Sequence, residues 1–257
     1  MTSLVRADPW AHLRRFTAAR IALGRSGGSL PTREVLAFAL DHALARDAVQ
    51  APFDPEALAA ELRAIHPDVL VLTSAAPDRA TYLRRPDLGR RLSPGSREQL
   101  AALPPVPCDL ILLISDGLSA LAAQRQAAPL LAALLPRLHE AGFTLGPLVV
   151  IKYGRVALQD EVGGRMESRL SLMLLGERPG LGTPDSLGAY LTYGPRPGRT
   201  DAERNCVSNI RDAGLAPALA ARKLAWLATK ALSGQRTGVG LKDDSDSPPT
   251  PLGTEPC

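Results

Sequence analysis

Three polar segments of the chain follow short apolar runs and carry residue types that can bind a ligand. Residues 115–119 (Ser-Asp-Gly-Leu-Ser) and 176–182 (Gly-Glu-Arg-Pro-Gly-Leu-Gly) follow two of these runs, and residues 153–156 (Tyr-Gly-Arg-Val) follow a third. The ligand crevice of an open α/β sheet lies beyond the carboxyl ends of its strands. If the apolar runs are strands of one sheet, all three segments could border one crevice.

Two of these segments have a structural interpretation beside the functional one. Ser115 or Asp116 could cap the helix that follows, or free N–H groups at that helix end could receive a polar group of a ligand. The glycines of residues 176–182 could form a tight turn, or they could let the backbone approach a ligand closely. The sequence alone leaves these alternatives open.

The common catalytic signatures are missing. Gly180-Leu181-Gly182 begins like a dinucleotide fingerprint, but Asp185 stands where the last glycine belongs, and the chain has no P-loop and no H-E-x-x-H motif. Cys206 lies in a polar stretch after a loop, where a cysteine is more often a small buried residue than a nucleophile. We therefore predict no catalytic residue in this chain.

Neither the cysteines nor the histidines suggest a metal site or a disulfide framework. The three cysteines share no Cys-x-x-Cys spacing, and the four histidines are scattered: Cys108, Cys206 and Cys257; His12, His42, His66 and His139. We expect no metal ligands and a reducing compartment.

The elements that position the polar segments follow from the apolar patterns. Four short, nearly continuous apolar runs predict strands of a parallel sheet, buried on both faces: residues 69–73, 110–114, 148–151 and 170–175. A helical stretch at 118–141, interrupted by Pro129 and Pro136, would join two of them into a strand-helix-strand unit. A fifth strand is predicted at 187–193 and a last helix at 216–232.

Helical patterns dominate the N-terminal part. Residues 9–24 predict an amphipathic helix, a second helix runs to about residue 49 with Leu36, Leu40 and Leu44 on its apolar face, and a third starts at Asp54. We therefore predict an α/β fold: an N-terminal helical segment at residues 1–66 precedes a Rossmann-like domain at residues 67–241. That domain has a mostly parallel sheet with flanking helices, and the Pro-rich, acidic residues 242–257 should form a disordered tail.

Composition excludes several classes of protein. Thirty Lys and Arg residues against 26 Asp and Glu residues give a net charge of only +4 over 257 residues, too little to imply nucleic-acid binding. No run approaches the roughly 18 apolar residues that a membrane span requires. We expect a cytoplasmic protein that binds neither nucleic acid nor membrane.

Many short motifs, taken in order, resemble those of a known family. The chain closely resembles the light chain, or small subunit, of ethanolamine ammonia-lyase over residues 8–241. The motifs that carry the resemblance include Asp8-Pro9-Trp10, Leu30-Pro31-Thr32-Arg33, Tyr82 to Leu92, Ser115 to Ser119, Gly154-Arg155-Val156, Gly176 to Gly182 and Cys206 to Ile210.

The resemblance implies a chain that is part of a two-chain lyase. In that family a large subunit, a (β/α)₈ barrel, binds ethanolamine, and the small subunit closes over adenosylcobalamin; the products are acetaldehyde and ammonia. The family's cofactor contacts fall on Val156, Glu177 and Cys206. We expect Val156 to contact the nucleotide-tail base, Glu177 to accept hydrogen bonds from the cofactor, and Cys206 to pack closely or to offer backbone polar groups.

The chain departs from the family at both ends. The longer polar N-terminal extension of some relatives, a plausible packaging signal for a bacterial microcompartment, is reduced here to about seven residues. We therefore favour the cytoplasm over a microcompartment. The acidic tail after Lys242 also differs from the family end and is expected to affect solubility rather than chemistry.

Two other functions remain as alternatives. One is a stand-alone Rossmann-like enzyme that uses a nucleotide cofactor, against which the failed glycine fingerprint argues. The other is a non-enzymatic interaction protein whose N-terminal helices dock to a partner through their apolar faces.

Overall fold

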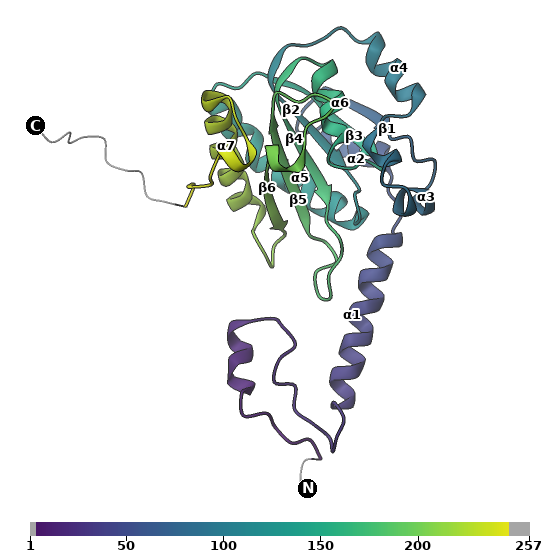
Figure 1. The fold of residues 1–257 in the computed structure, drawn as a ribbon, viewed down its shortest axis with the longest axis vertical. Coiled ribbons are helices and arrows are strands. Elements are labelled where there is room, and N and C mark those ends of the chain that lie inside the picture. Colours follow the sequence, from purple (N-terminus) through teal and green to yellow (C-terminus); the bar gives the residue numbers. More distant parts are fainter. Residues whose placement is uncertain (1–3, 247–257) are drawn as a thin grey trace, which may run out of the picture.

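A six-stranded sheet forms the centre of the molecule (Figure 1), and the computed structural model describes residues 4–246 of the chain. The strands are β1 (Val69–Thr73), β2 (Cys108–Ser115), β3 (Leu145–Lys152), β4 (Ser168–Gly176), β5 (Leu187–Tyr193) and β6 (Arg204–Ile210). Their order in the sheet is β1-β3-β2-β4-β5-β6, with β1 to β4 parallel and β5 and β6 antiparallel to their neighbours. The mixed α/β fold with a mostly parallel sheet is thus confirmed.

The central strand β2 shows why the apolar runs form this sheet. Successive side chains of a strand point to opposite faces. Leu110, Leu112 and Ile114 enter the apolar cluster on one face, while Ile111 and Leu113 enter the cluster on the other. All five are fully buried, so a nearly continuous apolar run is what a strand covered on both sides requires.

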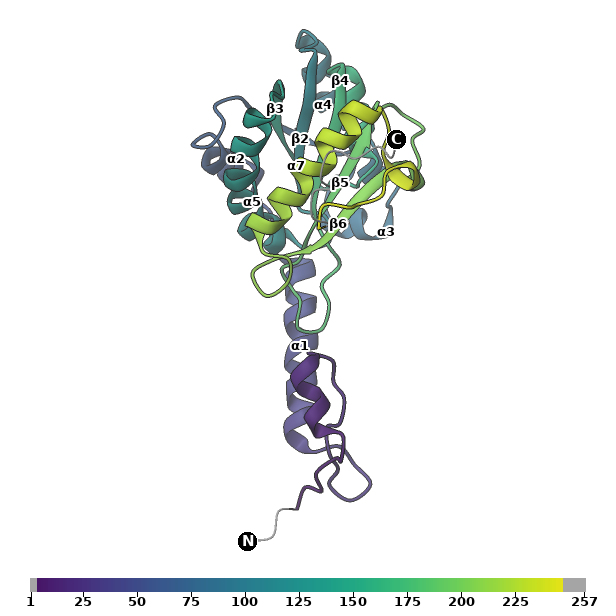
Figure 2. The same cartoon turned by 90° about the vertical axis from the view of Figure 1, so that its left-hand side faces the viewer.

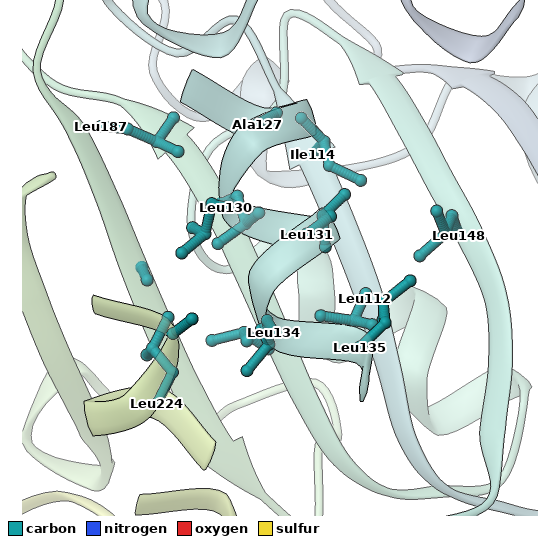
Figure 3. Close-up of a cluster of buried hydrophobic side chains, with 14 of the residues drawn as sticks. Leu112, Ile114, Ala127, Leu130, Leu131, Leu134, Leu135, Leu148, Leu187 and Leu224 are labelled. Carbon is teal, nitrogen blue, oxygen red and sulfur yellow. The ribbon is translucent and has the colours of Figure 1, made fainter. Parts of the chain in front are cut away.

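Helices cover both faces of the sheet. The helices are α1 (Thr32–Gln50), α2 (Pro55–Leu62), α3 (Arg79–Arg84), α4 (Pro94–Ala102), α5 (Ala120–Glu140), α6 (Leu158–Arg165) and α7 (Pro217–Gly234). Side chains of α2, α5 and α7 fill the larger cluster, and side chains of α4 and α6 help to fill the smaller one. Figure 3 shows Leu130, Leu131 and Leu134 of α5 directed toward the strands and α7.

Helix α5 is continuous, so the predicted interruption at Pro129 and Pro136 is wrong. A proline inside a helix removes one backbone hydrogen bond and its ring crowds the preceding turn. Both prolines lie on the exposed side of α5, where water can hydrate the carbonyls that they leave unpaired. The opposite side buries a row of leucines, each worth about 1.5–3 kcal/mol, and this packing holds the helix together.

The N-terminal part differs from the prediction. Residues 9–24 form only a short 3-10 helix at Ala11–Phe16, because their apolar side chains have no surface to pack against, and Phe16 is 71% exposed. Helix α1 protrudes from the body of the molecule (Figure 1), and its predicted apolar face of Leu36, Leu40 and Leu44 is exposed. Nothing in residues 4–246 covers that face.

The two remaining expectations concern the tail and the membrane. Residues 247–257 of the predicted tail lie outside the described part, whereas Asp243 and Asp246 form ion pairs with Lys223 of α7 at 2.8 and 2.9 Å. None of the helices between residues 4 and 246 has the length and the apolar character that crossing a bilayer requires.

Candidate functional site

A cleft of about 1100 Å³ lies at the carboxyl ends of β3 and β4 and runs toward β6. All three polar segments picked out from the sequence contribute to its wall: residues 115–119 through Leu118, residues 153–156 through Arg155 and Val156, and residues 176–182 through Gly176, Glu177 and Arg178. Cys206 of β6 completes it. The expectation that these segments border one crevice is confirmed, and Val156, Glu177 and Cys206 line the same cleft.

The end of β2 fixes the loop that carries Val156. The Tyr153 N–H donates to Asp116 Oδ1 at 2.7 Å, and the Gly154 N–H donates to Ser115 Oγ at 2.8 Å. Tyr153 has a φ of 62°, a left-handed conformation that costs energy for a bulky residue. The two buried polar side chains therefore hold a strained loop in place.

The helix cap predicted at Ser115 or Asp116 lies at Ser119 instead. Ser119 Oγ accepts the Ala122 N–H at 3.2 Å and so caps α5. Ser115 and Asp116 are fully buried, and each side chain accepts a hydrogen bond from a backbone N–H of the loop after β3. The sequence could not separate these roles, because the partners of Ser115 and Asp116 lie almost forty residues away along the chain.

Arg155 stacks on the ring of Tyr82 at one wall of the cleft. Its guanidinium carbon lies 4.3 Å from the ring centroid, and Nη2 donates to the Tyr82 carbonyl at 3.2 Å. Burial raises the pKa of Tyr82, so its hydroxyl stays protonated and donates to the Gly154 carbonyl at 3.0 Å. Arg155 lines the cleft, and its Nε is buried and has no hydrogen-bond partner within residues 4–246.

Glu177 joins three strands at the cleft rim. Its backbone N–H donates to the Ser186 carbonyl at 2.9 Å, and its Oε2 accepts the Ser186 hydroxyl and, at 3.1 Å, the Asn209 N–H. Its other oxygen, Oε1, accepts no hydrogen bond from residues 4–246. The carboxylate is therefore held in position with one oxygen available for a ligand.

Cys206 differs from the small buried residue that the sequence suggested. It is exposed on the edge strand β6, whereas the sequence predicted only a polar stretch after a loop. Desolvation at the cleft wall and the nearby Glu177 carboxylate raise the pKa of its thiol. A thiol with a raised pKa is protonated at neutral pH, so Cys206 provides a contact surface and not a nucleophile.

A buried ion pair that the sequence did not reveal links two walls of the cleft. Arg204 of β6 lines the cleft and donates to both carboxylate oxygens of Asp160 in α6, at 2.9 and 2.6 Å. Both side chains are almost completely buried. The two residues are 44 positions apart, and each looks like an ordinary surface charge in the sequence.

The buried carboxyl of Asp116 predicts an unusual pH dependence of stability. Burial raises its pKa from 3.8 to about 6, although Arg79 at 2.8 Å opposes the shift. Between about pH 4 and pH 6 the folded state binds more protons than the unfolded state, so stability falls as pH rises. Across this window we expect the free energy of unfolding of the wild type to fall by up to about 3 kcal/mol relative to that of Asp116→Asn. Urea unfolding at each pH measures the difference.

Asp109 provides the contrasting control. Despite desolvation, hydrogen bonds from Thr144 lower its pKa. This carboxyl stabilises the fold above its unfolded-state pKa, and that stabilisation is lost as pH falls. Asp109→Asn should therefore change the pH dependence of the free energy of unfolding in the opposite direction and at lower pH. Stability curves of wild type and Asp116→Asn that run parallel from pH 4 to pH 7 would contradict the assignment to Asp116.

Metal binding by the protein itself has no support in the described part. Residues 4–246 contain no group of three or more His, Cys, Asp and Glu side chains arranged to hold a metal ion. The cleft walls instead combine apolar side chains with guanidinium groups, two carboxylates and a thiol, among them Leu118, Val156, Arg155, Glu177, Asp201 and Cys206. This mixture suits a large organic ligand that presents both apolar and polar groups.

Comparison with known proteins decides the family. The sequence profile of the ethanolamine ammonia-lyase light chain matches residues 7–242. The chain belongs to this family. It is therefore a small subunit of ethanolamine ammonia-lyase, one component of a lyase complex. The resemblance that the sequence motifs indicated is thus confirmed.

Three relatives illustrate how closely the ethanolamine ammonia-lyase small subunits agree. The chain is 52% identical over 247 residues to that of Ralstonia nicotianae, covering 95% of this chain and 92% of the relative. It is 54% identical over 248 residues to that of Bradyrhizobium diazoefficiens, covering 96% and 95%. The small subunit of Azotobacter vinelandii is 52% identical over 242 residues, covering 93% and 90%.

Proposed function

We propose that this small subunit holds adenosylcobalamin in the cleft against a large catalytic subunit, for the radical deamination of ethanolamine to acetaldehyde and ammonia. The observation that carries the proposal is the convergence of Val156, Glu177 and Cys206 on one cleft of about 1100 Å³. These residues come from three separate elements, and the family resemblance implies all three as cofactor contacts. The three residues meet only when β3, β4 and β6 are assembled in one sheet.

The chemistry of the cleft fits this cofactor. Adenosylcobalamin presents a large ring edged with amide groups and a nucleotide tail with an aromatic base and a phosphodiester. The guanidinium group of Arg155 lines the cleft, and a guanidinium suits an amide carbonyl or a phosphate oxygen. Val156 adds an apolar contact on the same wall, where a ring or base can pack.

When bound, the cofactor supplies radical chemistry through homolysis of its cobalt–carbon bond. The residues of this chain bind and orient the ligand and exclude water. Glu177 accepts hydrogen bonds through Oε1, and Cys206 packs against the ligand with a protonated thiol. None of the residues lining the cleft is assigned a catalytic role.

Replacing Glu177 with alanine should weaken retention of the cofactor by about 1–3 kcal/mol, because a hydrogen bond to a charged acceptor is lost in a site shielded from water. Titration of the two-chain complex with adenosylcobalamin, followed by corrinoid absorbance, measures the affinity. Ser186→Ala is the matched control, since it removes the structural bond to Glu177 and leaves the carboxylate in place. Equal losses in the two variants would assign Glu177 a structural role only, and unchanged affinity in Glu177→Ala would remove it from the site.

The assembled enzyme tests the function as a whole. Purified chain is mixed with the large subunit, adenosylcobalamin and ethanolamine, and acetaldehyde is measured. We expect turnover only when both chains are present. Full turnover by the large subunit alone, or a two-chain complex without corrinoid absorbance after exposure to the cofactor, would refute the proposal.

A further inference from the structure

Residues 4–50 form an arm that extends away from the sheet. Helix α1 projects from the body, and the N-terminal segment lies beside it in both views (Figures 1 and 2). Only the end of the arm is attached: Ala48 is buried, and Arg79 Nε donates to the Val49 carbonyl at 2.8 Å. We call residues 4–50 the arm.

Within the arm, α1 exposes large apolar side chains around most of its circumference. Leu36 and Leu40 are 64% and 60% exposed, and Val35, Phe38 and Leu44 are exposed as well. Successive residues of an α-helix are about 100° apart, so these five positions do not form one stripe but lie around most of the helix circumference. Exposed large apolar side chains mark an interaction surface, and their spread around α1 fits a groove rather than a flat surface.

A second copy of this chain is a poor match for the arm, because the cleft of its body is already assigned to the proposed cofactor. In the described body, residues 51–246, the exposed large apolar side chains are isolated from one another along the chain: Val106, Leu181, Leu219 and Val239. Pairing of two arms is also unfavourable, because residues 1–50 carry seven arginines against four carboxylates and two such arms repel each other. The occupant is therefore a different protein that presents apolar and acidic groups.

We propose that the arm is the element by which this chain docks onto the large subunit, which accepts it in an apolar groove with an acidic rim. This inference rests on the proposed function, since it takes the large subunit as the partner. Exposed arginines at the C-terminal end of the 3-10 helix and on α1, including Arg14, Arg15 and Arg46, face such a rim, while Leu36, Phe38 and Leu40 enter the groove. The cleft and the arm are then separate contacts with one partner.

The test compares two variants of the full-length chain. Leu36→Asp/Leu40→Asp places two charges where the groove is apolar, and we expect binding to the large subunit, measured by sedimentation velocity, to weaken at least about 100-fold. The control Leu219→Asp changes a leucine of similar exposure, 51%, on α7 of the body, and binding should be unchanged. Both variants should keep the wild-type melting temperature, because their leucines are already exposed to water.

Each outcome decides the proposal. Wild-type affinity in the double variant overturns it, as does self-association of the chain alone that the double variant abolishes, since the arm would then bind a second copy. Equal weakening by Leu219→Asp also overturns it. A wild-type chain that does not bind the large subunit at all refutes the proposed function and the docking inference together, whereas retained binding with loss of corrinoid absorbance refutes only the proposed function.

Discussion

Replacing Asp160 with alanine is expected to lower the free energy of unfolding by about 3–5 kcal/mol, because it removes the buried counter-charge of the Arg204 guanidinium. The two side chains are only 2–3% exposed and are joined by two hydrogen bonds. Thr192 Oγ1 at 2.9 Å and the Arg199 carbonyl at 3.2 Å accept further hydrogen bonds from Arg204 but carry no charge. The remaining carboxylate, Asp201 at 3.4 Å from Arg204 Nε, is almost fully exposed, so solvent screens it. Guanidinium chloride unfolding of both proteins measures the difference.

An exposed pair of the same geometry provides the control. Arg85 donates to both carboxylate oxygens of Asp87 at 2.9 and 2.8 Å, but both side chains are in water. Asp87→Ala should therefore leave stability nearly unchanged, since solvent screens such pairs. If Asp160→Ala and Asp87→Ala unfold at the same denaturant concentration, burial does not determine the strength of the Asp160 pair.

The Asp160 pair also matters for the cleft. Asp160 lies in α6, four residues after Val156, and Arg204 lies in β6, two residues before Cys206. The pair thus ties together two elements that carry proposed cofactor contacts. Where the Asp160→Ala variant still folds, we expect it to retain less cofactor than the wild type.

The sheet was largely predictable because strands that are buried on both faces have nearly continuous apolar runs, which are visible in the sequence. The apolar runs at residues 69–73 and 187–193 coincide with β1 and β5. Strand β6 was missed because it lies at the sheet edge, where only three of its seven residues are buried and four of the seven are Arg, Asn or Ser. The helix predicted at residues 9–24 failed for the opposite reason: its spacing is helical, but no surface in the described chain receives its apolar side chains.

The site was predictable only in part. The rule that ligands bind beyond strand ends placed residues 153–156 and 176–182 on one crevice, which the cleft confirms. The position of Cys206 on that crevice depends on β6, and family resemblance rather than periodicity drew attention to it. Arg155 Nε and the Asp160 pair depend on packing between distant elements, which no local pattern in the sequence encodes.

Replacing Gly176 with alanine is expected to destabilise the fold by at least about 3 kcal/mol. A Cβ at this position would lie 2.1 Å from the Ser119 carbonyl oxygen and 2.3 Å from the Asp116 carbonyl oxygen. Both neighbours are backbone atoms and cannot rotate away. The Gly176 carbonyl also accepts the Leu118 N–H at 2.8 Å, so the end of β4 and the start of α5 are pressed together at this point. Thermal and urea unfolding of the purified variant measure the loss.

Gly95→Ala in α4 is the matched control, because a Cβ there has no neighbour within 4 Å and alanine favours the helix. It should be neutral or slightly stabilising. The comparison also tests whether Gly176 lets the backbone approach a ligand, one of the roles left open for residues 176–182, or serves the backbone packing that the structure reveals. If Gly176 serves close packing of backbone on backbone, the alanine variant loses stability before any ligand is added. If it served the approach of a ligand instead, the variant would unfold like the wild type and lose only corrinoid affinity, and that pattern would contradict the packing role.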